Sequence, residues 1–204
     1  MCIRDRSTHF RIATKDASVG LPEVHLGLLP GSAGTQRTPR LVGVKSAIDI
    51  MTTGKPVNAE KALAIGAIDE IVDDVKSGAI TFAKKIIESA TPLKRVSKSE
   101  ERVENNSENL GVIAQERAKW KKNSPHLNAP QKIIDCVEQA VLLDYAGGMN
   151  FEQKTFQELM DSDQSKSLIH AFFAERKSNK TPELERGAKP RPISKLGVIG
   201  GGTM

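Results

Sequence analysis

The 204-residue chain has few aromatic residues, few cysteines and no long apolar run, and each shortage excludes a class of protein. Aromatic side chains make up 4% and hydrophobic ones 38%, so the supply of core residues is lean and part of the chain is expected to need a partner. The two cysteines, Cys2 and Cys136, lie far apart and indicate no disulfide framework. No stretch approaches the roughly 18 apolar residues of a membrane span, and no secretory signal begins the chain. We therefore expect an intracellular protein without a membrane span.

The net charge of +5 raises the question of nucleic-acid binding. Lysine and arginine alternate with aspartate and glutamate through residues 94–122 and form no unbroken basic run. We interpret this stretch as a solvated helical face, with binding of an anionic small molecule as the weaker alternative, and expect no nucleic-acid partner. The four histidines, His9, His25, His126 and His170, lack the spacing of metal ligands, so the sequence predicts no metal site.

Short alternating elements are predicted over residues 8–73, which favours an α/β class. The segment "FRIAT" at residues 10–14 has the composition of a strand, and residues 67–72 predict another. Helices are expected over residues 35–42 and 43–54, the second ended by Gly54. Asn58 is expected to cap a further helix.

Residues 74–180 have the pattern of a mostly helical region. A first helix is predicted from apolar residues at helical spacing and is ended by Pro92; its apolar residues are Val75, Ala79, Phe82, Ala83, Ile86 and Ile87. A second is expected to be capped by Asn128 and stopped by the glycine pair 147–148. A third is expected to begin with a capping box of Asn150 and Gln153, and "SLIHAFFAERK" predicts a fourth.

The C-terminal segment "LGVIGGGTM" follows a polar, proline-containing linker and begins like a buried strand. Gly200, Gly202 and Met204 fit the first part of the G-x-G-x-x-G pattern, in which glycines let a pyrophosphate approach a helix N-terminus. The third glycine, the helix and the acidic ribose-binding residue are absent, so we expect this chain by itself not to hold a dinucleotide.

The stretch "GLPEVHLGLLPGSAGTQR", residues 20–37, contains the candidate catalytic residue. Glu23 follows Pro22 and precedes an apolar run, so its carboxylate is expected to be partly desolvated and suited to carry a proton at neutral pH. The alternative is a surface ion pair with Arg37 or Arg40, and spacing alone favours this second interpretation.

Residues 20–72, from "GLPEVHLGLLPG" to "AIGAIDEIV", resemble the second half of the crotonase signature, that of enoyl-CoA hydratases and isomerases. Together with "GVIGGGTM" at the other end, they resemble the multifunctional β-oxidation enzymes that join such a hydratase to a 3-hydroxyacyl-CoA dehydrogenase. The resemblance implies an α/β fold in four parts after an expected non-native leader at residues 1–7. These are an incomplete crotonase-type ββα spiral core at 8–73, a helical region at 74–185, a linker at 186–193 and the first strand of a Rossmann domain at 194–204.

The same resemblance implies an activity, a lyase step followed by an oxidoreductase step. The family hydrates trans-2-enoyl-CoA, in some members shifts a double bond, and the fused half oxidises 3-hydroxyacyl-CoA with NAD. Glu23 matches the glutamate that exchanges the α-carbon proton, and Pro22 and Gly31 match substrate-binding positions. The implied partners are an acyl-CoA thioester as substrate, further copies in an oligomer and a thiolase. The implied compartment is the cytoplasm in a bacterium or the peroxisome in a eukaryote.

The chain also departs from the family pattern. The family's first glutamate lies in a glycine-rich segment that would fall inside or before "MCIRDRS", so we expect that group, both oxyanion donors and the early strands to be missing and the chain alone to be inactive. Ala33 stands where glycine is usual, a mild change if its φ is negative and a strained one if φ is positive. Val19 replaces an aromatic residue. The alternative function is a non-catalytic crotonase-like module that binds acyl-CoA or assembles with partner chains.

Overall fold

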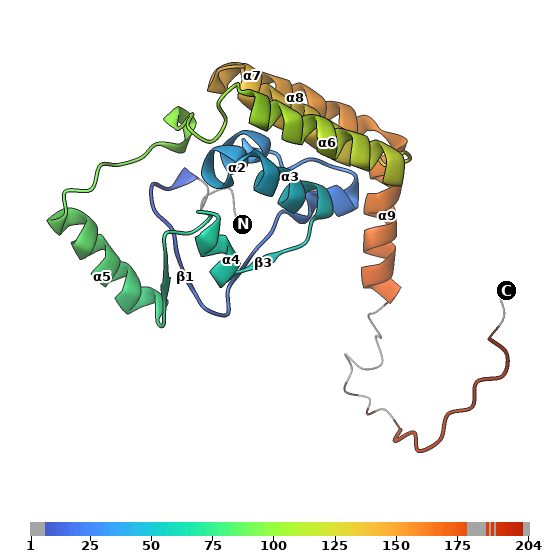
Figure 1. The fold of residues 1–204 in the computed structure, drawn as a ribbon. Helices are drawn as coiled ribbons and strands as arrows, with labels where there is room; N and C mark the ends of the chain where they lie inside the picture. The colour runs from blue at the N-terminus through green and yellow to red at the C-terminus, as the bar shows by residue number, and fades with distance from the viewer. Residues whose placement is uncertain (1–6, 179–186, 188, 190, 202–204) are drawn as a thin grey trace. The chain divides into compact units, whose positions relative to one another are not determined.

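The computed structural model describes residues 7–178, 187, 189 and 191–201 (Figure 1). The chain divides into two compact units, Met1–Ile169 and His170–Met204. The elements in chain order are β1 (Ile12–Thr14), β2 (Ser18–Val19), the 3₁₀-helix η1 (Pro22–Leu26), α2 (Gly34–Val42), α3 (Val44–Thr53), β3 (Val57–Asn58), α4 (Ala59–Ala64), β4 (Glu70–Val72), α5 (Val75–Glu88), the 3₁₀-helix η2 (Val96–Lys98), α6 (Ser107–Asn123), α7 (Asn128–Leu142), α8 (Tyr145–Asp161) and α9 (Asp163–Ser178).

The strands form two small sheets in the first unit. β1 pairs with β4 in parallel, with Ile12 opposite Glu70, and β2 pairs with β3 antiparallel, with Val19 opposite Val57. Two-stranded sheets are marginally stable by themselves, so these strands depend on the helices around them. The short alternating strands and helices confirm the α/β class expected for residues 8–73.

Two helix boundaries in this region agree with the sequence because their signals are local. The side chain of Asn58 accepts a hydrogen bond of 2.9 Å from the backbone N–H of Lys61, which caps α4. Gly54 ends α3 in the left-handed conformation, with φ of 64°, and its N–H bonds to the carbonyl of Ile50.

The helical region is organised around α7, which packs against α2, α3, α6 and α8 (Figure 1). Its buried face includes Ile133, Ile134 and Val137, each fully excluded from solvent. Arg117 of α6 joins the two helices by donating to Asp135 at 2.7 Å and to both carboxylate oxygens of Glu138. The expected helical character of the region after residue 74 is therefore confirmed.

Three expected helix ends in this region are wrong. Asn128 is the first residue of α7 rather than its cap, and its N–H is satisfied by the side chain of Gln164 at 2.9 Å. The glycine pair 147–148 does not stop a helix but lies inside α8, which begins after Asp144. Asp144 caps α8 by accepting from the N–H of Gly147, so Asn150 and Gln153 are interior residues.

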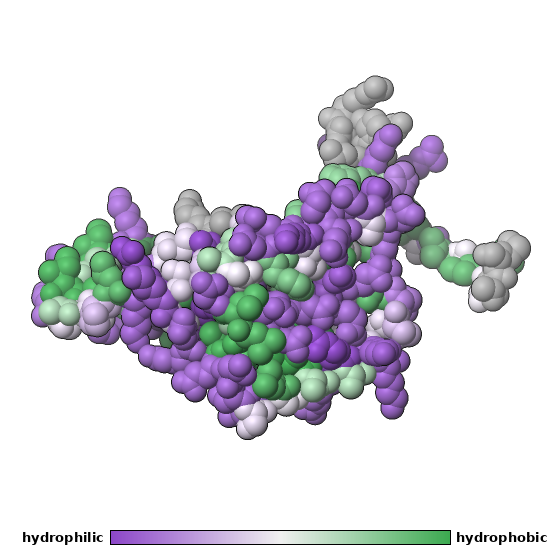
Figure 2. All heavy atoms as spheres, turned by 90° about the horizontal axis from the view of Figure 1, so that it is seen from above, coloured by the Kyte–Doolittle hydropathy of each residue, from purple (hydrophilic) through white to green (hydrophobic). Residues whose placement is uncertain are grey.

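Helix α5 forms where expected but ends at Glu88, before Pro92. Of its apolar residues, Ile87 is 76% exposed and Val75 54%, and Figure 2 shows hydrophobic side chains gathered over this helix at the left of the view. Phe82 makes an edge-to-face contact with Phe10 at 5.9 Å between ring centroids. Within the described part of the chain, other residues therefore cover little of the apolar face of α5.

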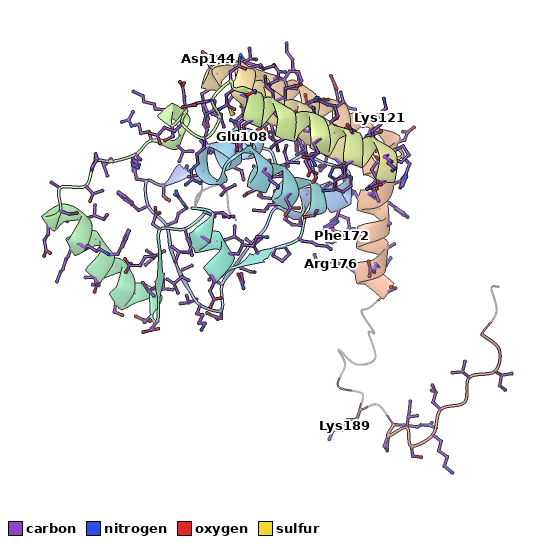
Figure 3. The ribbon with its side chains drawn as sticks, viewed as in Figure 1. Glu108, Lys121, Asp144, Phe172, Arg176 and Lys189 are labelled. Carbon is purple, nitrogen blue, oxygen red and sulfur yellow. The ribbon has the colours of Figure 1, made fainter. Side chains whose placement is uncertain are left out.

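The second unit contains the end of α9 and a C-terminal segment. Arg176 lies over the ring of Phe172 at 4.9 Å, as these labelled side chains show in Figure 3. Residues 191–201 contain neither helix nor strand, so the Rossmann strand expected over 194–204 is not formed in its described part. A strand needs a neighbour to pair its backbone, and none of the described residues pairs with this segment. Gly202 and Met204 lie outside the described residues.

No helix in the described ranges is both long enough and apolar enough to cross a bilayer.

Candidate active site

The candidate catalytic residue lies on a single 3₁₀ turn, η1. Pro22 occupies its first position, where the missing N–H costs nothing. Gly27 ends the turn with φ of 68°, and its N–H bonds to the carbonyls of Glu23 and Val24. A Cβ at Gly27 would lie 3.1 Å from the Cα of Ser165, so both backbone conformation and space require glycine here. The proline and the glycine thus fix the short turn that carries Glu23.

Glu23 is half-buried, and its Oε2 atom is shielded from solvent without a hydrogen-bond partner among the described residues. The ion pair considered from the sequence is not formed. Arg37 donates to the carbonyl of Ser32 at 3.2 Å, and Arg40, only 4% exposed, donates to two backbone carbonyls. A buried carboxylate oxygen without a partner is costly for a purely structural residue and is typical of a group that exchanges protons with a ligand.

The turn after η1 has a strained backbone. Ser32 and Ala33 have φ of 54° and 66°, in the left-handed region. Ala33 therefore carries the strain anticipated for a non-glycine residue with positive φ, at a cost of about 1 kcal/mol. Gly31 lies directly against Phe156 of α8, because a Cβ on Gly31 would be 3.3 Å from the phenyl ring.

A second carboxylate, which the sequence analysis missed, holds this turn. Glu152 of α8 is 1% exposed, and its Oε1 accepts from the N–H of Ala33 at 2.7 Å. Its Oε2 accepts from the N–H of Thr35 at 2.9 Å and from the hydroxyl of Thr35 at 2.6 Å. The N-terminus of α2, which follows a glycine-rich turn and could attract a phosphate, is therefore occupied by a carboxylate of the chain itself.

The signal for Glu152 was present in the sequence. It lies four residues after Gly148, three before Thr155 and seven before Leu159, and all four share the buried face of α8. A glutamate at helical spacing with buried residues needs internal partners, because an unpaired buried charge is strongly unfavourable. The sequence did not indicate which donors would supply them.

A polar network continues beneath the turn. Gln36, fully buried, donates to the hydroxyl of Thr35 at 3.2 Å and to the carbonyl of Cys136 at 2.9 Å. Burial raises the pKa of the Cys136 thiol to about 12, so the thiol is protonated at neutral pH and is not a nucleophile. The network supports the turn and contributes no reactive group.

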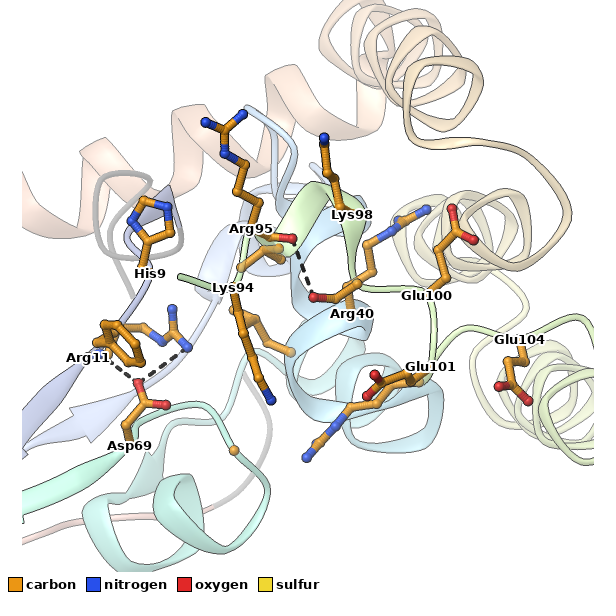
Figure 4. Close-up of a pocket in the computed structure, with 16 residues that line it drawn as sticks. His9, Arg11, Arg40, Asp69, Lys94, Arg95, Lys98, Glu100, Glu101 and Glu104 are labelled. Carbon is orange, nitrogen blue, oxygen red and sulfur yellow. Dashed lines mark hydrogen bonds and ion pairs between the residues drawn. The ribbon is translucent and has the colours of Figure 1, made fainter. Parts of the chain in front are cut away.

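The basic residues of the segment after α5 line a different cavity, of about 730 Å³ (Figure 4). In this view the side chains of Arg95 and Lys98 extend upward and that of Lys94 extends downward, so the three do not point toward one centre. Acidic residues share the lining, and Asp69 pairs with Arg11 at 3.5 Å. This mixture of charges agrees with a solvated surface, but the expected helical face over residues 94–122 is formed only by η2 and α6, because Lys94, Arg95 and residues 99–106 are not helical. Glu23 does not line the cavity.

Clusters of three or more histidine, cysteine, aspartate or glutamate side chains able to hold a metal ion do not occur in the described part of the chain. The prediction of a site without a metal concerns the whole chain and stays a prediction.

Comparisons with known proteins show the family to which the chain belongs. The family model described as enoyl-CoA hydratase/isomerase matches residues 7–127, which include η1 and the turn after it. The glyoxysomal fatty acid beta-oxidation multifunctional protein of Cucumis sativus is 39% identical over 199 residues, covering 96% of this chain and 27% of that protein. The human peroxisomal bifunctional enzyme is 39% identical over 201 residues, covering 96% and 28%. The fatty acid oxidation complex subunit alpha of Shewanella frigidimarina is 38% identical over 202 residues, covering 96% and 28%.

Solved structures give the same fold. A carnitinyl-CoA hydratase from Mycobacterium avium has a TM-score of 0.52 and 26% identity, with 84% of this chain and 54% of that one covered. A carnitinyl-CoA dehydratase from the same species has a TM-score of 0.51 at 20% identity, with 84% and 55% covered, a likeness of fold alone. This chain spans 27–28% of the length of the curated relatives named above, and the expected resemblance to multifunctional β-oxidation enzymes is confirmed. The chain belongs to the enoyl-CoA hydratase/isomerase family.

Proposed function

We propose that Glu23 exchanges the α-carbon proton of an enoyl-CoA thioester in a fatty-acid β-oxidation enzyme of which this chain is a part. The observation that carries the proposal is the buried, unpartnered Oε2 of Glu23 on a turn fixed by Pro22 and Gly27. A carboxylate without an internal partner is available to a ligand, whereas Glu152 nearby has its oxygens committed to Ala33 and Thr35. The family match and the relatives' names supply the substrate class.

The reaction adds water across the double bond of trans-2-enoyl-CoA to give a 3-hydroxyacyl-CoA. Water attacks the β-carbon, the electron pair of the double bond moves toward the thioester oxygen, and a proton is added at the α-carbon. Glu23 delivers that proton and a second carboxylate activates the water. Two backbone N–H donors stabilise the negative thioester oxygen, a contribution worth about 10²–10³ in rate for each donor. Pro22, which is exposed, and Gly31 are proposed to contact the substrate.

Neither the second carboxylate nor the pair of donors is assigned to a residue of this chain, so we propose that the 204-residue chain alone does not hydrate enoyl-CoA. In the natural protein, Gly200, Gly202 and Met204 are proposed to begin the NAD-binding turn of a 3-hydroxyacyl-CoA dehydrogenase. Gly200 has φ of 84°, which suits the tight turn of the first glycine in that pattern. We also propose that the natural protein associates with a thiolase or with further copies of itself.

The test is hydration of crotonyl-CoA by the natural protein expressed from its complete reading frame. Glu23→Gln should lower kcat by about 10²–10⁴, because it removes a general acid of nearly unchanged shape. The matched control is Glu60→Gln, whose side chain is 67% exposed on α4, and it should leave kcat within about twofold of the parent.

Two other results would change the interpretation. Turnover above background by the 204-residue chain would contradict its proposed inactivity. Binding of acyl-CoA by the natural protein without turnover, and without any effect of Glu23→Gln, would favour the non-catalytic module.

A further inference from the structure

The segment that carries Glu23 is held at three points by α8 and the beginning of α9. The hydroxyl of Ser165, which is fully buried, donates to the carbonyl of Leu26 at 2.9 Å, at the end of η1. The ring of Phe156 lies against Gly31. Glu152 accepts from the two backbone amides that flank Gly34. The helical region therefore directly supports residues 23–35, the segment that begins with Glu23.

Of these three contacts, that of Glu152 is the most demanding. A buried carboxylate must have its hydrogen bonds satisfied, and charge-assisted bonds of this kind are short and strongly directional. By accepting from Ala33 and from Thr35, the carboxylate fixes the orientation of two peptide planes in a turn whose backbone is strained. Without this acceptor the left-handed pair Ser32–Ala33 would lose the contact that compensates its strain.

The held turn is connected to Glu23 by a short, rigid stretch. Leu28 is 8% exposed and Leu29 is fully buried, and Pro30 after them is buried as well. The N–H of Leu28 also bonds to the carbonyl of Glu23 at 3.2 Å. Because this stretch is not a flexible linker, a displacement at Ala33 also shifts η1, the turn that carries Glu23.

We propose that Glu152 is a positioning residue for proton transfer by Glu23. It does not touch the substrate; it holds the turn of residues 31–35 in the strained conformation that keeps Gly31 and Glu23 in place. This inference rests on the proposed function for its catalytic part, whereas the holding of the turn is a property that can be measured without turnover.

The experiment compares Glu152→Gln with Glu158→Gln in the natural protein. The first substitution keeps one acceptor oxygen and turns an N–H₂ group toward a backbone donor, whereas Glu158 is on the same helix with a side chain 61% exposed. Amide exchange of residues 31–35 should rise at least about tenfold in Glu152→Gln and stay unchanged in Glu158→Gln. In crotonyl-CoA hydration, Glu152→Gln should lower kcat by about 10- to 100-fold with KM changed less than about threefold.

A further variant separates positioning from general stability. Ala33→Gly removes the side chain that is strained at positive φ, so it should restore at least half of the logarithmic loss of kcat in the Glu152→Gln background. If Glu152→Gln does not fold, Glu152→Asp, which withdraws the charge by one methylene, is measured in its place with the same expected direction.

The proposal is overturned if exchange at residues 31–35 is unchanged, or if exchange rises while kcat does not fall. Failure of the proposed function is recognised separately, because Glu23→Gln would then be as active as the parent. In that case the catalytic part of this inference falls with it, and the exchange measurement still decides whether Glu152 holds the turn.

Discussion

Helices α5 and α7 have similar sequence patterns and opposite surroundings. Both place apolar residues at helical spacing, yet eight residues of α7 are buried, while no residue of α5 is. Helix α7 packs against four other helices, whereas α5 contacts β1. Apolar periodicity thus predicts which face of a helix is able to pack, but the partner that covers this face must be supplied by the rest of the fold.

Truncation of an apolar side chain should give the largest difference between the two helices in its effect on stability. Ile133→Ala in α7 should lower the free energy of unfolding by about 3 kcal/mol, because it leaves a cavity at a fully buried position. Ile87→Ala in α5 should change it by less than about 0.5 kcal/mol, because this side chain is 76% exposed. Urea unfolding of the chain measures both, and equal losses would mean that α5 is covered in solution.

A glycine-to-alanine pair tests how closely the helices next to α7 approach their neighbours. In Gly148→Ala of α8 the new methyl group would overlap the side chain of the buried Gln36, so we expect a loss of about 1–3 kcal/mol. In Gly111→Ala of α6 nothing lies within 4 Å of the new atom, and the substitution should stabilise by about 0.5–1 kcal/mol. Thermal unfolding distinguishes these outcomes, and a stabilising Gly148→Ala would contradict the close approach.

The buried thiol of α7 should make stability depend on pH, and α5 contains no cysteine. Burial raises the pKa of Cys136 from its ordinary 9.0 to about 12, so between these values the unfolded chain binds fewer protons than the folded one. The contribution of this thiol to stability is therefore complete below pH 9 and is lost as the pH rises toward 12, by up to about 1.4 kcal/mol per pH unit. Unfolding of the parent and of Cys136→Ala from about pH 8 to about pH 11 measures the difference, and parallel curves would contradict it.

Ion pairs should show the smallest effect. Arg117, which joins α6 to Asp135 and Glu138 of α7, is about one-third exposed, so Arg117→Met should cost roughly 1 kcal/mol or less after solvent screening. Lys85 of α5 pairs with Glu70 at 3.0 Å but is 68% exposed, and Lys85→Met should cost less than about 0.5 kcal/mol. Denaturation at low and high salt checks both, since a loss that is independent of salt in Arg117→Met would indicate packing rather than charge.

The features of the fold that sequence patterns predicted correctly are those with local causes. The Asn58 cap and the Gly54 helix end depend on atoms within four residues. Gly148 failed as a helix stop because its role is set by Gln36, more than a hundred positions away, whose side chain leaves no room for a Cβ. The conformation of Ala33 was left open by the sequence, and its positive φ is stabilised by Glu152, again from a distant part of the chain.

The residues of the candidate site also differ in whether a local sequence pattern indicates their role. Glu23 could be singled out as a candidate because the proline, apolar residues and glycine around it form one contiguous pattern that resembles a known family; spacing alone favoured a surface ion pair. Glu152 could not be assigned to the site, because 119 positions separate it from Ala33 and no motif in either segment indicates a contact with the other. Its burial could be predicted only from its helical spacing with Thr155 and Leu159.

The order of synthesis gives these distant contacts a further consequence. Leu26 and Ser165, joined by one hydrogen bond, are 139 positions apart, so the turn bearing Glu23 leaves the ribosome long before its supports exist. Such non-local contacts form late, because the intervening chain must first be ordered. The nascent chain therefore has its candidate acid/base residue, Glu23, from early in translation, but gains a fixed geometry for it only once α8 and the start of α9 have folded.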